Sequence, residues 1–243
     1  MSAKPDTAMV LAAGLGTRMR PLTDDRPKPL VRVAGKALVD YALDRFAAAG
    51  VARAVVNVHA FADMMEAHLE GRSEPEIIIS DERELLLETG GGLKKASAHF
   101  AEAPVFSTNT DAILLDDPGT EACARLADFW DEAAMDALLL LAPKERASGY
   151  DGAGDFELDD KARLDWRRGT QAPYIFTGLQ IISPRLLEGA PDGAFSMRVL
   201  WDKAYEAGRL CGLVHKGFWM HVGDPQGLRS AEARLAALAG AAR

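Results

Sequence analysis

A short apolar run near the start of the chain, residues 8–13, stops abruptly at Gly14. An apolar run without polar alternation is typical of a strand that is buried on both faces, as in a parallel sheet. The loop that follows, residues 14–32, is rich in glycine, proline and charge. A buried strand followed by such a loop is typical of α/β proteins, which bind their ligands in loops at the carboxyl ends of parallel strands. This order therefore constrains the fold strongly.

The rest of the first 142 residues alternates between helical and extended patterns. Residues 38–49 repeat apolar side chains with helical spacing and end at Gly50, a common helix cap. Further strands are expected at residues 54–58, 76–80, 105–109 and 136–142, and helices at residues 61–69, 93–100 and 121–132. This alternation predicts an α/β fold with a doubly wound, mostly parallel, Rossmann-like sheet. The loops after Ala13, Ser80 and Asn109 should meet at one edge of that sheet.

The pattern changes after Pro143. Strands are expected at residues 155–158, 162–166, 174–182 and 210–215, and helices at residues 184–187, 196–207 and 225–239. No repeat or low-complexity linker separates the two halves. We therefore expect a single domain over residues 1–243, in which residues 143–243 form a small lid or acceptor region and a C-terminal helix.

Composition excludes several classes of protein. The net charge of −8 repels nucleic acid and anionic membranes, so a phosphate-bearing ligand requires a local basic pocket or a metal ion. The two cysteines form no Cys-x-x-Cys pair, which argues against structural zinc. No apolar stretch approaches the ~20 residues of a membrane span, and residues 1–7 contain no signal-peptide core. We expect a cytoplasmic protein with no nucleic acid or membrane partner.

The loop after the first strand carries the chemistry of phosphate binding. Gly14 and Gly16 let backbone N–H groups approach phosphate oxygens. Arg18 offers forked hydrogen bonds to phosphate, and Lys28, between two prolines, adds a point charge. The segment is neither a P-loop nor a dinucleotide fingerprint, because Met19 occupies the position of the third glycine.

Residues 11–30 as a whole resemble the signature of the nucleoside-diphosphate-sugar pyrophosphorylases, L-A-A-G-x-G-T-R-M/L-x-P-L-T followed by P-K-P-L. Four later segments resemble the base loop, the metal-binding strand end, the acceptor-sugar strand and the late W-x-D-V-G motif of that family: residues 87–92, 109–111, 176–178 and 217–223. The resemblance implies a sugar-1-phosphate nucleotidyltransferase, in which a sugar 1-phosphate attacks the α-phosphorus of a nucleoside triphosphate (NTP) and displaces pyrophosphate. Because the nucleophile is already an anion, catalysis requires positioning and charge neutralisation without a general base.

The resemblance also implies roles for individual residues. Arg18, Lys28 and Asp111 are the expected catalytic residues, and Asp111 is the expected ligand of Mg²⁺. The expected nucleotide-binding half is residues 1–142, and its expected binding residues are Leu11, Ala12, Ala13, Gly14, Gly16, Thr17, Arg18, Lys28, Glu88, Gly90 and Gly91. The expected sugar-binding residues are Asn109, Gly154, Thr177 and Gly178.

Simpler explanations exist for some of these residues. An aspartate after a strand, such as Asp111, often caps a loop or helix, and Glu88 fits a solvated loop charge equally well. Three successive glycines, residues 90–92, cost backbone entropy before a helix. Their presence favours the close approach of a flat ligand at this loop.

The late motif departs from the family at two positions. His221 stands where the family has a second metal-binding aspartate, and Asp224 stands where threonine is usual. Imidazole is a poor ligand for Mg²⁺. Four interpretations of His221 are open: a metal ligand that favours Mn²⁺ or Co²⁺, a phosphate contact beside an Asp111-bound Mg²⁺, the mark of a site that has lost turnover, and a structural histidine. The phosphate contact is the favoured interpretation.

The base loop reads L-E-T-G-G-G, where long guanylyl- and adenylyltransferases tend to carry L-G-T-A-G. A short chain with this loop resembles the N-acetylmuramate 1-phosphate uridylyltransferases of peptidoglycan recycling, which implies UTP and N-acetylmuramate 1-phosphate as substrates. The alternatives are a mannose 1-phosphate guanylyltransferase that uses GTP and a nucleotide-sugar-binding regulator without catalysis. We expect a monomer or a small homo-oligomer.

Overall fold

The computed structural model describes residues 4–241, so the prediction for the start of the chain lies in part outside the described residues. The α-helices are α1 (Leu38–Ala48), α2 (Ala62–Leu69), α3 (Glu88–Ala96), α4 (Ala122–Phe129), α5 (Met197–Glu206) and α6 (Pro225–Ala241). The strands are β1 (Thr7–Leu11), β2 (Arg32–Val33), β3 (Lys36–Ala37), β4 (Arg53–Val58), β5 (Glu76–Asp81), β6 (Val105–Asn109), β7 (Ala112–Leu115), β8 (Ala137–Pro143), β9 (Ala147–Ser148), β10 (Phe156–Leu158), β11 (Leu164–Trp166), β12 (Tyr174–Ile182), β13 (Leu210–Val214) and β14 (Phe218–His221). Short 3₁₀ turns cover Thr17–Met19, Lys28–Leu30, Ser97–His99, Lys144–Arg146 and Pro184–Leu187.

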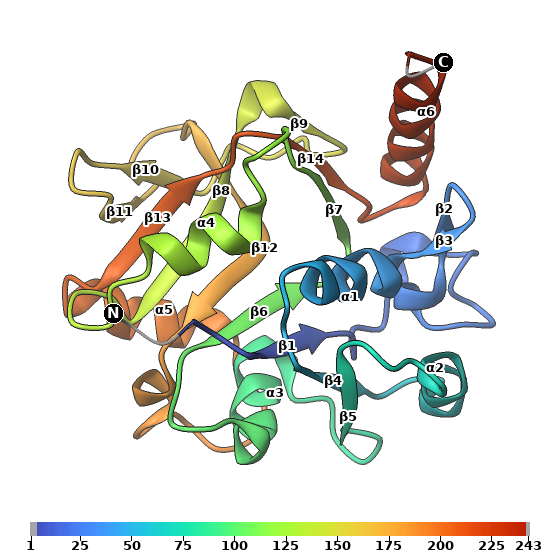
Figure 1. Ribbon diagram of the computed structural model, residues 1–243, viewed down its shortest axis with the longest axis horizontal. Coiled ribbons are helices and arrows are strands. Elements are labelled where there is room, and N and C mark those ends of the chain that lie inside the picture. Colours follow the sequence, from blue (N-terminus) through green and yellow to red (C-terminus); the bar gives the residue numbers. More distant parts are fainter. Residues whose placement is uncertain (1–3, 242–243) are drawn as a thin grey trace.

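The central sheet runs in the order β11-β10-β12-β6-β1-β4-β5, and β8 joins it at β12 and pairs with β13 (Figure 1). Strands β6, β1, β4 and β5 are parallel, as are β8 and β13. The predicted α/β class with a mostly parallel sheet is confirmed. The sequence did not predict that β12 runs antiparallel to both β6 and β8. Because β12 pairs with both, the strands of the second half continue the sheet of the first.

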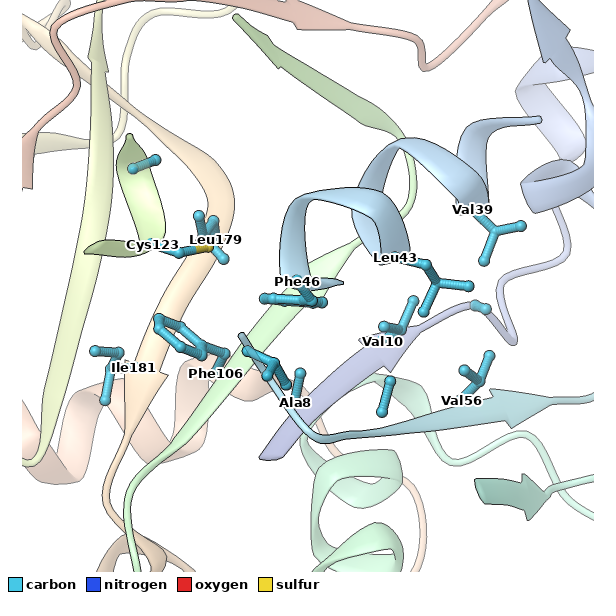
Figure 2. Packing of buried hydrophobic residues seen from close by; sticks show 14 of the residues in the cluster. Ala8, Val10, Val39, Leu43, Phe46, Val56, Phe106, Cys123, Leu179 and Ile181 are labelled. Atoms are coloured by element: carbon cyan, nitrogen blue, oxygen red, sulfur yellow. The ribbon is translucent and has the colours of Figure 1, made fainter. Parts of the chain in front are cut away.

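Helices cover both faces of this sheet. On β1, Ala8 and Val10 face one cluster of buried side chains with α1, α2 and α4, whereas Met9 faces a second cluster with α3 and α5. This alternation is the period of two that a strand imposes on its side chains. Figure 2 shows the first cluster, in which Phe46 of α1 lies against Phe106 of β6 with ring centroids 5.7 Å apart.

A second, smaller sheet has the order β7-β14-β9. Strand β14 pairs antiparallel with β7 (Figure 1). His221 therefore lies opposite Ala112, which is the residue that follows Asp111 in the sequence. The sequence predicted neither strand, because each has only four residues and too little periodicity to indicate a strand. This pairing nevertheless joins the late motif to the carboxyl end of β6.

Two predicted helices differ in the structure. Helix α3 begins at Glu88, five residues before the predicted start, so that Gly90, Gly91 and Gly92 lie within it. Glycine disfavours a helix, but tertiary contacts override that preference here. The segment Pro184–Leu187 is a 3₁₀ turn. Within residues 4–241, no helix is long and apolar enough to cross a membrane.

His215, directly after β13, is almost fully buried, with Nδ1 3.9 Å from Asp116 Oδ1. Burial lowers the pKa of this imidazole, against the opposing effect of Asp116. The unfolded chain therefore binds a proton near pH 6.5 that the folded chain excludes, and the free energy of unfolding should fall as pH drops from 7 to 5. We expect His215→Gln to flatten this dependence in urea titrations.

The control for this measurement is His99→Gln, which removes an exposed histidine. The control should show the same pH dependence of the free energy of unfolding as the unmodified chain. One histidine contributes at most about 1.4 kcal/mol per pH unit to the slope of this dependence. Equal slopes for the chain with and without His215 would contradict the assignment of the acid sensitivity to this side chain.

Candidate active site

A cavity of about 500 Å³ opens at the carboxyl ends of β1, β4 and β6. Among the residues predicted from the sequence, those that line it are Leu11, Ala12, Ala13, Gly14, Gly16, Thr17, Arg18, Lys28, Glu88, Asn109 and Asp111. The other lining residues, to which the sequence analysis gave no individual binding role, are Pro29, Asn57, Leu86, Thr89, Thr110, Ser196 and Gly223. The loops after β1, β5 and β6 thus meet at one edge of the sheet, as parallel strands require.

The two glycines of the first loop differ in their surroundings. A Cβ on Gly14 would have no atom within 4 Å, so its backbone is open to a ligand. Gly16 has φ +62°, and a Cβ there would lie 2.8 Å from Lys28 Cβ. The Thr23 hydroxyl donates a hydrogen bond of 2.9 Å to the Gly16 carbonyl. Gly16 therefore lets the loop close onto Lys28, whereas Gly14 leaves space at the cavity.

Lys28 and Asp111 form an ion pair at the floor of the cavity, with Nζ 3.0 Å from Oδ2. Their side chains are 11% and 26% exposed. Burial alone would raise the pKa of the Asp111 carboxyl, but the neighbouring His221 imidazole and the Lys28 ammonium outweigh it and hold that pKa well below its usual range. Arg18 is exposed and forms no ion pair within residues 4–241. Arg18 and Lys28 thus line a cavity that also holds the carboxylates of Glu88 and Asp111, and of the two cations Arg18 is the one without an ion pair among residues 4–241.

The His221 ring has a defined orientation. Its Nδ1 lies 3.1 Å from the Gly149 carbonyl, and because a carbonyl only accepts, Nδ1 carries the proton. The other ring nitrogen, Nε2, lies 3.7 Å from Asp111 Oδ2 and carries a proton only when the ring is positively charged. The ring stacks on Trp219 with centroids 5.7 Å apart. Within the described residues, no group of three or more His, Cys, Asp or Glu side chains is placed to hold a metal ion.

The other unusual residue of the late motif, Asp224, has a structural explanation. Its Oδ1 accepts hydrogen bonds from the N–H groups of Gln226 (2.9 Å) and Gly227 (2.8 Å) at the start of α6. Aspartate and threonine both serve as helix N-caps, so this substitution keeps the local structure. Gly223 clears space for the histidine, since a Cβ there would lie 2.3 Å from the His221 ring.

Gly90 and Gly91 do not line the cavity, and the structure corrects the explanation given for them. Their N–H groups donate hydrogen bonds of 2.9 and 3.1 Å to the Phe195 carbonyl. A Cβ on Gly90 would lie 2.5 Å from the Phe195 ring, and one on Gly91 would lie 2.3 Å from the Gly193 carbonyl oxygen. These glycines are required because another segment of the chain, rather than a flat ligand, packs against α3. Glu88, with φ 57°, does face the cavity.

Three of the predicted sugar-binding residues, Gly154, Thr177 and Gly178, also lie outside the cavity lining. The Thr177 hydroxyl donates to the Leu140 carbonyl (2.9 Å), and a Cβ on Gly154 would lie 2.2 Å from the Ala172 carbonyl oxygen. Gly178 has φ +95° at an irregularity of β12, where a Cβ would lie 3.2 Å from Asn109 Cβ. These residues shape the strand behind Asn109, which itself lines the cavity.

Sequence reasoning missed two polar residues at the cavity, Asn57 and Ser196, and gave no individual role to Thr89 of the base loop. Asn57 Oδ1 accepts hydrogen bonds from the N–H groups of Ala12 (2.6 Å) and Ala13 (3.2 Å). Thr89 Oγ1 accepts one from the Met197 N–H (2.8 Å), and Ser196 caps α5. The available signal for Asn57 was a single amide side chain within an otherwise apolar strand.

Comparison with known proteins identifies the family. A model described as "Nucleotidyl transferase" matches residues 7–163, and this chain belongs to that family, which confirms the resemblance found in the sequence. The N-acetylmuramate alpha-1-phosphate uridylyltransferase of Caulobacter vibrioides is 50% identical over 97% of this chain and 99% of the relative. The protein of that name from Neisseria meningitidis serogroup B is 32% identical over 93% of this chain and 96% of the relative.

Other relatives are more distant. The mannose-1-phosphate guanyltransferase beta-B of Xenopus laevis is 29% identical over 90% of this chain, which spans only 61% of that relative. Among solved structures, the inositol-1-phosphate CTP transferase from T. maritima has a TM-score of 0.76 and 19% identity, over 97% of this chain and 98% of the other. That likeness supports the fold.

The contrast between Gly14 and Gly91 generates a prediction. Gly14→Ala adds a methyl group in open space at the cavity, so stability should change by less than about 0.5 kcal/mol while the affinity for UTP falls about tenfold. Gly91→Ala forces a methyl group against a carbonyl oxygen and should lower the free energy of unfolding by about 1–3 kcal/mol. Urea denaturation and calorimetric UTP titration measure both quantities. Unchanged UTP affinity in Gly14→Ala would show that the first loop does not approach the nucleotide.

Proposed function

We propose that this chain transfers the uridylyl group of UTP to N-acetylmuramate 1-phosphate, forming UDP-N-acetylmuramate and pyrophosphate. The observation that carries the proposal is the cavity at the carboxyl ends of β1, β4 and β6, which is lined by two cations of the first loop, Arg18 and Lys28. The choice of substrates rests on the 50% identity with the Caulobacter vibrioides relative over nearly the whole of both chains.

In this reaction a phosphate oxygen of the sugar 1-phosphate forms a bond to the α-phosphorus of UTP. The bond between the α-phosphorus and the bridging oxygen breaks, and pyrophosphate leaves with the electron pair. The nucleophile is an anion, so the protein needs to bring two anions together and neutralise their charge. The exposed Arg18 guanidinium suits the triphosphate, and the buried Lys28 ammonium suits the α-phosphate.

The remaining residues position the substrates. Leu86, just before the base loop, and Glu88 and Thr89 within it line the cavity and would contact the base. Asn109 would contact the ribose or the sugar. Gly154, Thr177 and Gly178 would act indirectly, by setting the path of the strands behind Asn109, and Gly90 and Gly91 by seating α3. The role of these five residues is indirect because they contact other protein segments and do not line the cavity.

The donor set at Asp111 and His221 fits a divalent metal ion. Asp111 Oδ2 and His221 Nε2 lie 3.7 Å apart. The Gly149 carbonyl accepts from Nδ1 and orients the ring, so that the neutral imidazole would offer the Nε2 lone pair to a metal ion. With only two protein ligands, phosphate oxygens and water would complete the coordination. A nitrogen ligand favours Mn²⁺ or Co²⁺ over Mg²⁺. A bound ion would neutralise charge on the triphosphate.

The proposed substrates predict the outcome of a pyrophosphate-release assay with every pair of UTP or GTP and N-acetylmuramate 1-phosphate or mannose 1-phosphate. Release should be fastest with UTP and N-acetylmuramate 1-phosphate. Lys28→Met should reduce kcat/KM by about 100-fold or more, because it removes a charge that acts on the transition state. Release with only GTP and mannose 1-phosphate would overturn the substrate assignment, and nucleotide binding without any release would indicate a regulator.

The metal assignment predicts a change of preference in His221→Asp. Replacing nitrogen with a carboxylate oxygen should keep or raise turnover with Mg²⁺ and reduce the advantage of Mn²⁺. Equilibrium binding of Mn²⁺, followed by electron paramagnetic resonance without substrate, gives a readout independent of activity. His99→Asp makes the same chemical change at an exposed site and should alter neither quantity. A folded His221→Asp chain that binds Mn²⁺ like the unmodified chain but has no turnover would refute the assignment.

A further inference from the structure

A buried pair of polar side chains joins Asn57 of β4, which lines the cavity, to Glu82 just after β5, which does not. The two residues are 2% and 1% exposed, and Asn57 Nδ2 donates a hydrogen bond of 2.8 Å to Glu82 Oε1. A carboxylate at this depth is costly unless its oxygens accept hydrogen bonds. Such a pair is weak evidence for stability, since apolar residues would fill the space at a lower cost.

The outer ends of the pair reach two different loops. Asn57 Oδ1 accepts hydrogen bonds from the Ala12 and Ala13 N–H groups, at 2.6 and 3.2 Å. Glu82 Oε2 accepts one of 3.2 Å from the Leu87 N–H at the start of α3. One continuous chain of hydrogen bonds therefore links the first loop to the base loop, and both loops line the cavity.

The third glycine of the base loop leaves room for this pair. A Cβ on Gly92 would lie 2.9 Å from both Asn57 Nδ2 and Glu82 Oε1. Gly92 thus differs from Gly90 and Gly91, which make room for the segment around Phe195. The base loop is shaped on one side by that segment and on the other by the buried pair.

We propose that Asn57 and Glu82 are positioning residues that fix the separation of the two loops around the nucleotide, and thereby set NTP affinity and the preference among bases. This inference rests on the proposed function, because it assigns the cavity to an NTP. Neither side chain takes part in the chemical step. Their effect is carried by the backbone N–H groups of Ala12, Ala13 and Leu87, whose places they determine.

The donor and acceptor order of the pair allows a swap. Asn57→Asp places two carboxylates together, and Glu82→Gln brings an amide that cannot accept at both ends, so each single change breaks the chain of hydrogen bonds. In the double variant, the new aspartate accepts from the first loop and from the new glutamine amide, whose oxygen accepts from Leu87 N–H. The double variant has one carboxylate and one amide, so its net charge equals that of the original pair. Glu84→Gln is the matched control, because it removes an exposed carboxylate in the same loop.

We expect each single variant to raise the dissociation constant of UTP and KM for UTP about tenfold or more and to narrow the preference for UTP over GTP. KM for N-acetylmuramate 1-phosphate should stay within about twofold, and the double variant should return to within about threefold of the original UTP affinity. A purely structural pair would instead lower the melting temperature and leave UTP affinity unchanged, which would overturn the proposal. If Asn57→Asp does not fold, Glu82→Gln decides alone.

Failure of this proposal is distinguishable from failure of the proposed function. If the unmodified chain releases no pyrophosphate but binds UTP, calorimetric UTP binding in the four chains still tests the pair. If the unmodified chain turns over UTP and the double variant is no closer to it than the singles, the reaction stands and the positioning role is refuted.

Discussion

The parallel alignment of β1 between β4 and β6 determines where the functional side chains lie. It brings the ends of three strands to one edge, so that Gly14, Asn57 and Asp111 surround the same cavity although they are far apart in the sequence. The Lys28–Asp111 ion pair then closes the first loop onto the end of β6. Because both groups are largely buried, breaking either partner would leave an uncompensated charge. The loop is therefore held in a shape that presents Arg18 to the cavity.

The second half of the chain contributes to this site because its strands pair with those of the first half. Strand β12 runs antiparallel beside β6 and supports Asn109 through the glycine at 178. Strand β14 runs antiparallel to β7 and delivers His221 to the carboxylate of Asp111. Gly149 and Gly223 leave room for the histidine and its backbone. The chain thus places an imidazole nitrogen beside the carboxylate of Asp111, which lines the cavity.

Much of the fold could be predicted from local patterns. The continuous apolar run of β1, the periodic face of α1 and the alternation of elements are local properties, and they gave the α/β class and the edge of the sheet. Strands β7 and β14 could not be predicted, because four residues carry too little periodicity. The requirement for Gly90 comes from Phe195 and that for Gly91 from Gly193, each more than 100 residues away in the sequence. The contacts of Asn57 depend on three strands at once. Such constraints exist only in the folded chain.

The most direct test of this account is a crystal structure of the chain with bound UDP-N-acetylmuramate. The account predicts the uracil against Leu86 and Glu88 and the diphosphate beside Arg18 and Lys28. A second cavity, of about 560 Å³, lies between α1 and α4 and provides an internal comparison. A nucleotide bound there, with the first cavity empty, would contradict the assignment of the active site to the carboxyl ends of β1, β4 and β6.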